Sequence, residues 1–252
     1  RVLKIDGRNI KLPLVVADRG IRQVDEGAAL LAGLLDLVQS RCSLDGVLSL
    51  ATSDLILKNL GVNSEGVEHW YRYAEKANVR WGLTEEHRKR NGLHAPELSA
   101  HSWRNALEQM LLGALLPDGT GSFEAFGVDA LDDVDMSDVD EIAALIQIFN
   151  AILALSDQTG EQHTVTDWCD LTESAMLLLC GENCDEIAVA VKQIGLLRSS
   201  AAGNLIEVPF ADVARQLGDM MSQIPGRQPL RTGAITATSM IPLRGVPFRV
   251  VC

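Results

Sequence analysis

The densest set of side chains that could do chemistry is a run of four consecutive basic residues that follows shortly after Trp81. The run consists of His87, Arg88, Lys89 and Arg90. Clustered Lys and Arg side chains bind nucleic-acid phosphates or an acidic partner surface, and a Trp beside them offers a ring on which a single-stranded base can stack. The alternative is structural, with a solvated helix face for the cations and a core position for the Trp, which is mostly buried on average. Both interpretations stay open, and Arg88, Lys89 and Arg90 are candidate nucleic-acid contacts.

A second chemical signal is the acidic run Asp129–Glu141, which contains six aspartates. Such a run could indicate a calcium loop or the carboxylates of a two-metal nuclease site. A calcium loop of the EF-hand type needs a glycine at a fixed position, and that glycine is missing here. Carboxylates in the first turn of a helix are stabilised by the helix dipole. We therefore interpret the run as a solvated loop followed by a helix start, and we predict no metal site.

The five cysteines are Cys42, Cys169, Cys180, Cys184 and Cys252. Their odd number and irregular spacing favour reduced thiols over a disulfide framework. Cys180 and Cys184 are the only close pair, and no second pair of Cys or His follows at the spacing of a zinc site. The preferred interpretation is that these thiols are structural.

Catalytic motifs are missing from the sequence. A phosphate-binding G-x-x-x-x-G-K-[ST] loop does not occur, so this stretch cannot hydrolyse ATP by that route. The five histidines are scattered, and no serine has a nucleophile motif around it, although a Ser-His-Asp site is recognised by geometry rather than by sequence position. We predict no catalytic residue and no cofactor in this chain.

The last stretch, Ile235–Cys252, reads ITATSMIPLRGVPFRVVC. It resembles the strand–loop–strand of superfamily 1 DNA helicases, T-x-H-x-x-K-G-L-E-F, with Ser239 in the Thr place and Arg244 in the Lys place. The helicase His and Glu are replaced by Ile241 and Pro247. This altered form, T-x-M-P-x-R-x-x-P-F, is typical of the RecC family, the gamma subunits of exodeoxyribonuclease V (RecBCD).

Further segments are similar to RecC and follow one another in the family's order. They are LPLVVADRGIRQ (Leu12–Gln23), NVRWGL (Asn78–Leu83), HSWRNALEQMLLG (His101–Gly113) and VPFADVARQLGDMM (Val208–Met221). The resemblance covers nearly the whole chain, and the sequence is identified as a member of the RecC family. It departs from the family pattern at Asn105-Ala106, where the family has Phe-Gly, and in the acidic run.

The resemblance implies a mainly α fold, in which a helical 2B-type insertion domain is flanked by short strands of a RecA-like 2A domain. The expected boundaries are 1–25 for the first 2A flank, 26–228 for the helical domain and 229–252 for the return to 2A, the altered helicase motif V region. Because the chain begins at Arg1 without Met and stops inside an apolar segment, we expect a fragment of a longer protein.

Composition agrees with a globular helical domain. The chain has 252 residues, of which 47% are hydrophobic, and a formal net charge of −12. That apolar share is enough for a core, whereas duplex binding usually needs a basic stripe. The net negative charge of the chain favours binding to partner proteins with basic surfaces. No run of about 18 uncharged apolar residues and no secretory signal are visible, so we predict no membrane span. The cytoplasmic location is what the resemblance to RecC implies.

Apolar spacing and capping residues predict helices over most of the chain. The predicted helices are Gly27–Val38, two short ones after Ser43 and Ser53, one after Ser64 that runs to about Ala77, one after Thr84, one after Ser99 or Ser102, one capped by Ser137 that runs to about Leu155, one capped by Thr166, Asp185–Arg198 and Ala211–Ile224. Strands are predicted at Leu12–Ala17, Leu205–Val208, Ile235–Thr238 and Phe248–Cys252.

The function that the resemblance implies is that of a non-motor subunit in a cytoplasmic complex with RecB-like and RecD-like partners. Such a complex binds broken duplex ends and single-stranded tails, unwinds and degrades DNA, and serves recombinational repair. ATP and Mg²⁺ would be used by the partner subunits. The chain would supply scaffolding, subunit docking and strand guidance, without ATP coupling, because the helicase His and Glu are lost.

The same resemblance adds candidate nucleic-acid contacts. Arg19 and Arg22 lie beside the expected hinge between 2A and 2B, and Ser239 and Arg244 lie in the altered helicase loop. A guanidinium at position 244 could hold a phosphate through two hydrogen bonds.

Two other functions remain open. The first is an active superfamily 1 helicase whose motor motifs lie outside this stretch, and Ile241 and Pro247 argue against it. The second is an independent helical adaptor with no DNA role, and the two 2A-like ends argue against it.

Overall fold

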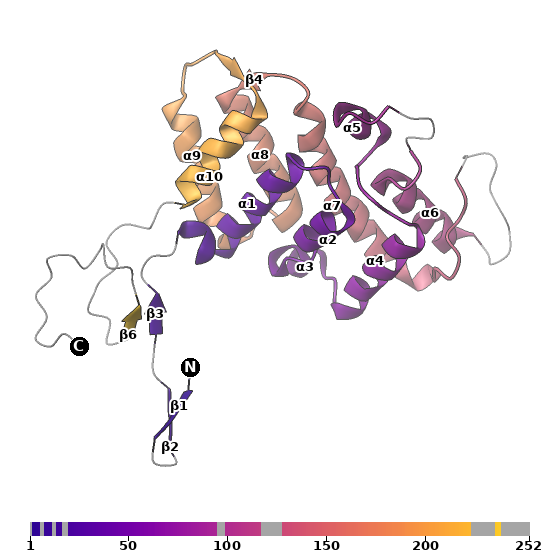
Figure 1. Ribbon diagram of the computed structural model, residues 1–252, viewed down its shortest axis with the longest axis horizontal. Helices are drawn as coiled ribbons and strands as arrows, with labels where there is room; N and C mark the ends of the chain where they lie inside the picture. Colours follow the sequence, from indigo (N-terminus) through magenta and orange to yellow (C-terminus); the bar gives the residue numbers. More distant parts are fainter. Residues whose placement is uncertain are drawn as a thin grey trace, which may run out of the picture.

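A computed structural model describes residues 2–5, 8–11, 14–16, 20–94, 99–116, 128–222 and 235–237 of the chain. The described part is dominated by α-helices (Figure 1). They are α1 (Glu26–Val38), α2 (Leu44–Ala51), α3 (Asp54–Leu60), α4 (Ser64–Lys76), α5 (Glu85–Arg90), α6 (Trp103–Leu115), α7 (Val139–Gln158), α8 (Val165–Cys180), α9 (Ala188–Ser200) and α10 (Phe210–Ser222). Short 3-10 turns are η1 (Ile21–Gln23), η2 (Met136–Asp138) and η3 (Asp185–Ile187). The predicted mainly α class is confirmed.

Several helices begin where the sequence places a capping side chain. Ser43, Thr84 and Ser102 each accept a hydrogen bond from the backbone N–H three residues later, which satisfies one of the free donors of the first turn. The predicted cap of α8 at Thr166 is wrong. Thr164 caps that helix instead, because Asp167 lies three residues later and completes a reciprocal capping box.

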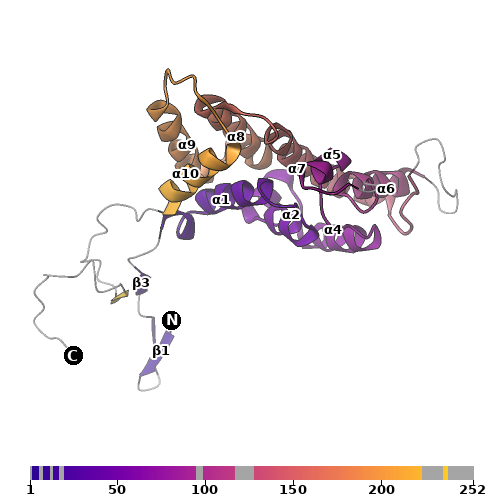
Figure 2. The ribbon, with the colours of Figure 1, turned by 45° about the horizontal axis from the view of Figure 1, so that its top comes forward.

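The helices form two rows that pack on each other around α7. Figure 2 shows α1, α2 and α4 following one another along one side and α8, α7 and α6 along the other. Helix α7 contacts α8, α6, α4 and α1, and its Ile148 and Ile152 are completely buried. By length and composition the stretch Met136–Gln158 could cross a membrane, but more than half of its apolar window is buried inside the fold. It is the central core helix here.

Short strands lie to one side of the helices and at one of their connections. β1 (Val2–Ile5) and β2 (Arg8–Lys11) pair antiparallel, and β4 (His163–Thr164) pairs antiparallel with β5 (Glu207–Val208). β3 (Leu14–Val16) pairs in parallel with β6 (Ile235–Ala237), so a segment before the helices lies beside a segment after them.

The parallel pair agrees with the strands predicted at both ends of the helical region. The pair β1–β2 was not predicted, and Phe248–Cys252 lies outside the described residues. The domain boundaries 1–25, 26–228 and 229–252 stay a prediction.

Candidate functional site

Arg88, predicted as a phosphate contact, is a buried structural residue in this fold. Its side chain lies against Trp81, with the guanidinium carbon 5.2 Å from the ring centroid. Nε and Nη2 donate to the Trp81 carbonyl at 2.9 and 2.6 Å, and Nη1 donates to the Ala100 carbonyl at 2.5 Å. Gly82, at φ +86°, makes room, because a Cβ there would lie 2.6 Å from Arg88 Cγ. Arg88 therefore ties α5 to two loop segments.

The other two cations of the basic run also have partners within the chain. Lys89 Nζ lies 2.6 Å from Glu85 Oε1, one helical turn earlier. Arg90 donates to Asp157 Oδ1 at 2.8 Å and to the Ser156 carbonyl at 2.5 Å, so it joins α5 to the end of α7. The basic run thus points in several directions and forms no common face. Whether these residues contact nucleic acid stays a prediction.

Trp81 is half-buried and is already stacked within the chain. The guanidinium groups of Arg41 and Arg88 lie over its ring, at 5.5 and 5.2 Å from the centroid. Trp81 is therefore neither a fully buried core residue nor an open ring on which a base could stack, the two alternatives considered from the sequence.

The remaining predicted contacts are not brought together by the described structure. Arg22 is exposed on η1, next to the start of the helical region. Arg19, Ser239 and Arg244 lie outside the described residues.

His87, the first member of the basic run, is buried beside a cavity. It is 2% exposed, and its Nε2 lies 3.8 Å from the Cys42 sulfur. The cavity has a volume of about 460 Å³ and is also lined by Arg90, Thr159 and Phe210. Burial, followed by the charge of Arg90, lowers the pKa of His87 to about 4. The imidazole is therefore neutral at pH 7.

The buried imidazole predicts a loss of stability in acid. His87 has a folded-state pKa of about 4 and an ordinary pKa of 6.5. Between these two pH values the imidazole is protonated in the unfolded chain but neutral in the folded chain. The free energy of unfolding should fall by roughly 1.4 kcal/mol per pH unit between these values through this group alone. We expect His87→Gln to flatten this part of the pH profile in urea unfolding, and the exposed control His94→Gln to leave it unchanged. Equal slopes in all three proteins would contradict the assignment.

The four cysteines within the described residues agree with structural thiols, and Cys252 lies outside the described residues. Cys42, Cys169 and Cys180 are buried and free, and Cys184 is partly exposed and free. Burial raises the pKa of Cys42 and Cys180 to about 12 and that of Cys169 to about 11. These three side chains behave as small apolar residues of the core.

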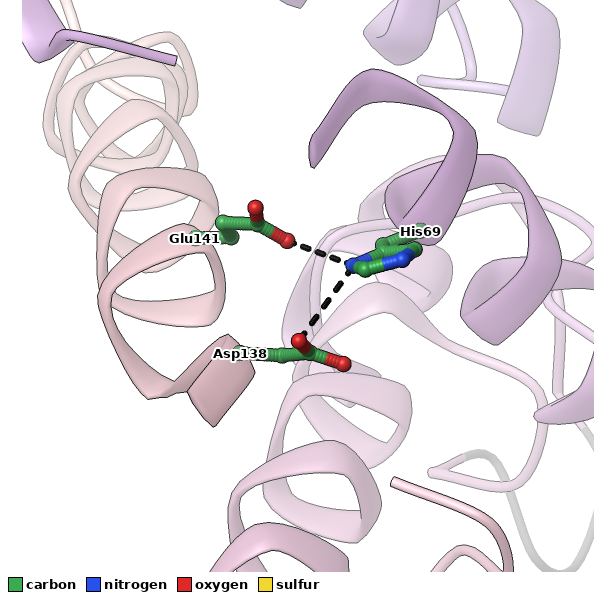
Figure 3. Close-up of side chains that lie close together, drawn as sticks. All are labelled: His69, Asp138 and Glu141. Atoms are coloured by element: carbon green, nitrogen blue, oxygen red, sulfur yellow. Dashed lines mark hydrogen bonds and ion pairs between the residues drawn. The ribbon is translucent and has the colours of Figure 1, made fainter. Parts of the chain in front are cut away.

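Sequence reasoning missed a polar cluster where α4 meets α7 (Figure 3). His69 Nδ1 lies 2.7 Å from Glu141 Oε2 and 3.5 Å from Asp138 Oδ1. The hydroxyl of Tyr73 donates to the second oxygen of Asp138, and Trp70 Nε1 donates to the Glu141 carbonyl at 2.8 Å. The members come from one face of α4, from the end of η2 (Asp138) and from the first turn of α7 (Glu141). The acidic run is therefore only partly solvated, since Asp138 is buried.

The hydroxyl of Tyr73 is expected to stabilise this cluster. In Tyr73→Phe the buried Asp138 carboxylate loses a hydrogen-bond donor, and we expect the free energy of unfolding to fall by about 1–3 kcal/mol. Urea unfolding measures this change. Tyr71→Phe, at an exposed neighbouring position, should stay within about 0.5 kcal/mol of the parent chain. An equal loss of stability in both variants would show that the hydrogen bond from Tyr73 to Asp138 does not stabilise the fold.

A sequence model of one domain family matches most of this helical region. It is described as the RecBCD enzyme subunit RecC fourth domain and covers residues 25–225. The chain belongs to the RecC family. Proteins named RecBCD enzyme subunit RecC match along 96% of the chain: that of Mycolicibacterium smegmatis is 27% identical over 243 residues, that of Mycobacterium tuberculosis 25% over 246, and that of Escherichia coli (strain K12) 22% over 256. The chain spans 22% of the length of each of these relatives.

The segments that resemble RecC coincide with packing features of the fold. Asn78–Leu83 carries Trp81 and Gly82, which hold Arg88. His101–Gly113 forms most of α6, and Val208–Met221 forms most of α10. In this RecC-family chain these three segments therefore lie in packed parts of the helical fold.

Proposed function

We propose that this chain is the fourth-domain region of a RecC-type, non-motor subunit. The subunit would work in a helicase and nuclease complex that processes double-strand DNA breaks for recombinational repair. The complex would be cytoplasmic, with RecB-like and RecD-like partners that use ATP and Mg²⁺. The observation that carries this proposal is the match to the RecC fourth domain over residues 25–225.

Within that complex we assign the helical region to scaffolding and subunit docking. The net charge of −12 opposes a phosphate-binding face. The cations of α5 support the same assignment, since Arg88, Lys89 and Arg90 already bind carbonyls and carboxylates of this chain. DNA would be reached through the full complex.

Strand guidance is assigned to the altered helicase loop, with Arg244 as the phosphate contact. Arg244→Ala in the full-length subunit, reconstituted with its partners, should weaken binding of single-stranded DNA and slow unwinding. The slope of log affinity against log salt should become shallower by about one, as expected for one lost phosphate contact. Lys58→Ala, which removes an exposed cation paired with Glu186, is the matched control and should change neither quantity. Unchanged unwinding and unchanged DNA affinity in Arg244→Ala would reject this role.

A further inference from the structure

We propose that His69, Asp138 and Glu141 form a binding site for one divalent transition-metal ion, of the Mn²⁺ and Zn²⁺ class, at the junction of α4 and α7 (Figure 3). The donor atoms are an imidazole nitrogen and one oxygen from each of two carboxylates. All three lie within 4.8 Å of one another.

The spacing of the donor atoms suits a small cation. His69 Nδ1 is 2.7 Å from Glu141 Oε2 and 3.5 Å from Asp138 Oδ1. Bonds of about 2.0–2.2 Å to one ion place neighbouring ligand atoms roughly 3 Å apart. The two separations from Nδ1 bracket this value, so we expect side-chain rotations to bring the donors to bonding distance.

The surrounding residues hold two of the ligands in place. Tyr73 donates to one oxygen of Asp138, which leaves the other oxygen toward His69. Trp70 Nε1 donates to the Glu141 carbonyl and so fixes the start of α7 against α4. Gly66 leaves space for the Glu141 carboxyl, since a Cβ at that position would lie 2.9 Å from its Cδ. Hydrogen bonds to ligating groups of this kind typically raise metal affinity.

The charge of the cluster and its solvent exposure also suit an ion that exchanges with solvent. The two carboxylates balance the charge of a divalent cation, and the nearby Lys76 is paired with Asp133 rather than with this site. The His69, Asp138 and Glu141 side chains are 15%, 9% and 24% exposed, so the site is sheltered but open to solvent. The imidazole nitrogen favours Mn²⁺ or Zn²⁺ over Mg²⁺ and Ca²⁺, which prefer oxygen ligands alone.

Binding requires a proton to leave Nδ1. In the tautomer that carries its proton on Nδ1, this nitrogen donates a hydrogen bond to the Glu141 carboxylate. When the nitrogen lone pair binds the ion, the proton moves to Nε2 or to solvent, and no other bond breaks.

The test is titration of the 252-residue chain with Mn²⁺ alone, followed by electron paramagnetic resonance of the free ion. Mn²⁺ is chosen because it prefers oxygen and nitrogen donors and avoids the cysteine thiols. We expect one site per chain, at least 100-fold weaker binding in His69→Ala and Glu141→Gln, and about 10-fold weaker binding in Tyr73→Phe. Zn²⁺ should compete for the site, and equimolar Mg²⁺ should not.

Matched controls keep the outcome decisive. Asp140→Asn changes an exposed carboxylate of the same helical turn, and His94→Ala changes an exposed histidine elsewhere, so neither should alter the affinity. Circular dichroism identifies variants that fail to fold, and Glu141→Gln and Tyr73→Phe replace His69→Ala if that variant unfolds. The absence of a stoichiometric Mn²⁺ site, or binding that is equal in parent, Glu141→Gln and Asp140→Asn, would overturn the proposal and leave the cluster as a hydrogen-bonded network only.

Discussion

Arg88→Ala should lower the free energy of unfolding by about 3–4 kcal/mol, as expected when a buried hydrogen-bond network is broken. The side chain is 5% exposed and donates to the carbonyls of Trp81 and Ala100. Truncation leaves both carbonyls without these donors and opens a space beside Gly82. The measurement is urea unfolding followed by circular dichroism, with the midpoint and slope compared between variants.

Two further variants separate the contribution of the buried hydrogen bonds of Arg88 to stability from the contribution of its charge. Lys89→Ala removes the neighbouring exposed cation and should cost no more than about 0.5 kcal/mol, as is usual for a surface ion pair. Arg88→Lys keeps the charge but loses the planar fork that reaches two carbonyls, so its stability should fall between those of the parent and Arg88→Ala. Equal stabilities of Arg88→Ala and Lys89→Ala would contradict the structural role of Arg88.

Gly27→Ala should also be strongly destabilising, by about 2–3 kcal/mol, because α1 approaches the backbone of η3 at this glycine. A Cβ there would lie 2.5 Å from the Glu186 carbonyl oxygen and 2.7 Å from the Ile187 Cα. Both are backbone atoms, so relief requires the two segments to separate, which is the usual cost of overpacking. Thermal and urea unfolding of the variant report the loss.

The matched control, Gly195→Ala, should change the free energy of unfolding in the opposite direction. Gly195 lies inside α9, and a Cβ there meets no atom within 4 Å. Gly195→Ala should stabilise the chain by about 0.5–1 kcal/mol, because Ala restricts the unfolded chain and favours the helix. A neutral or stabilising Gly27→Ala would contradict the close packing of α1 on η3.

Local elements were predictable because their signals are local. The Ala- and Leu-rich stretch after Glu26 forms α1, and the capping side chains of Ser43 and Thr84 stand where their helices begin. The parallel pairing of β3 with β6 joins segments at opposite ends of the chain. Local strand signals predicted the two strands, but their pairing was not predicted, because no local propensity links the two ends of the chain.

The directions of the α5 side chains illustrate what local reasoning leaves open. Four consecutive residues on a helix point to every side of it, so one run of basic letters need not form one basic face. His87 and Arg88 turn inward, whereas Lys89 turns outward. Which side is buried depends on where Trp81 and α7 pack, and the local sequence of α5 does not specify this.

The cluster at α4 and α7 was missed for a related reason. His69 is far in sequence from Asp138 and Glu141, and its i,i+4 partner Tyr73 looks like an ordinary helix-face residue. The charge of the acidic run suggested a solvated loop. The cluster forms because Asp138 is buried against α4.

We propose that this RecC-family region serves as a docking scaffold rather than as a DNA-binding surface. The most direct measurement is binding of the purified chain to the RecB-like subunit, in parallel with binding to single-stranded DNA across a salt titration. We expect specific subunit binding, together with weak DNA binding that moderate salt abolishes. Tight DNA binding that survives salt, with no binding to the subunit, would contradict the claim.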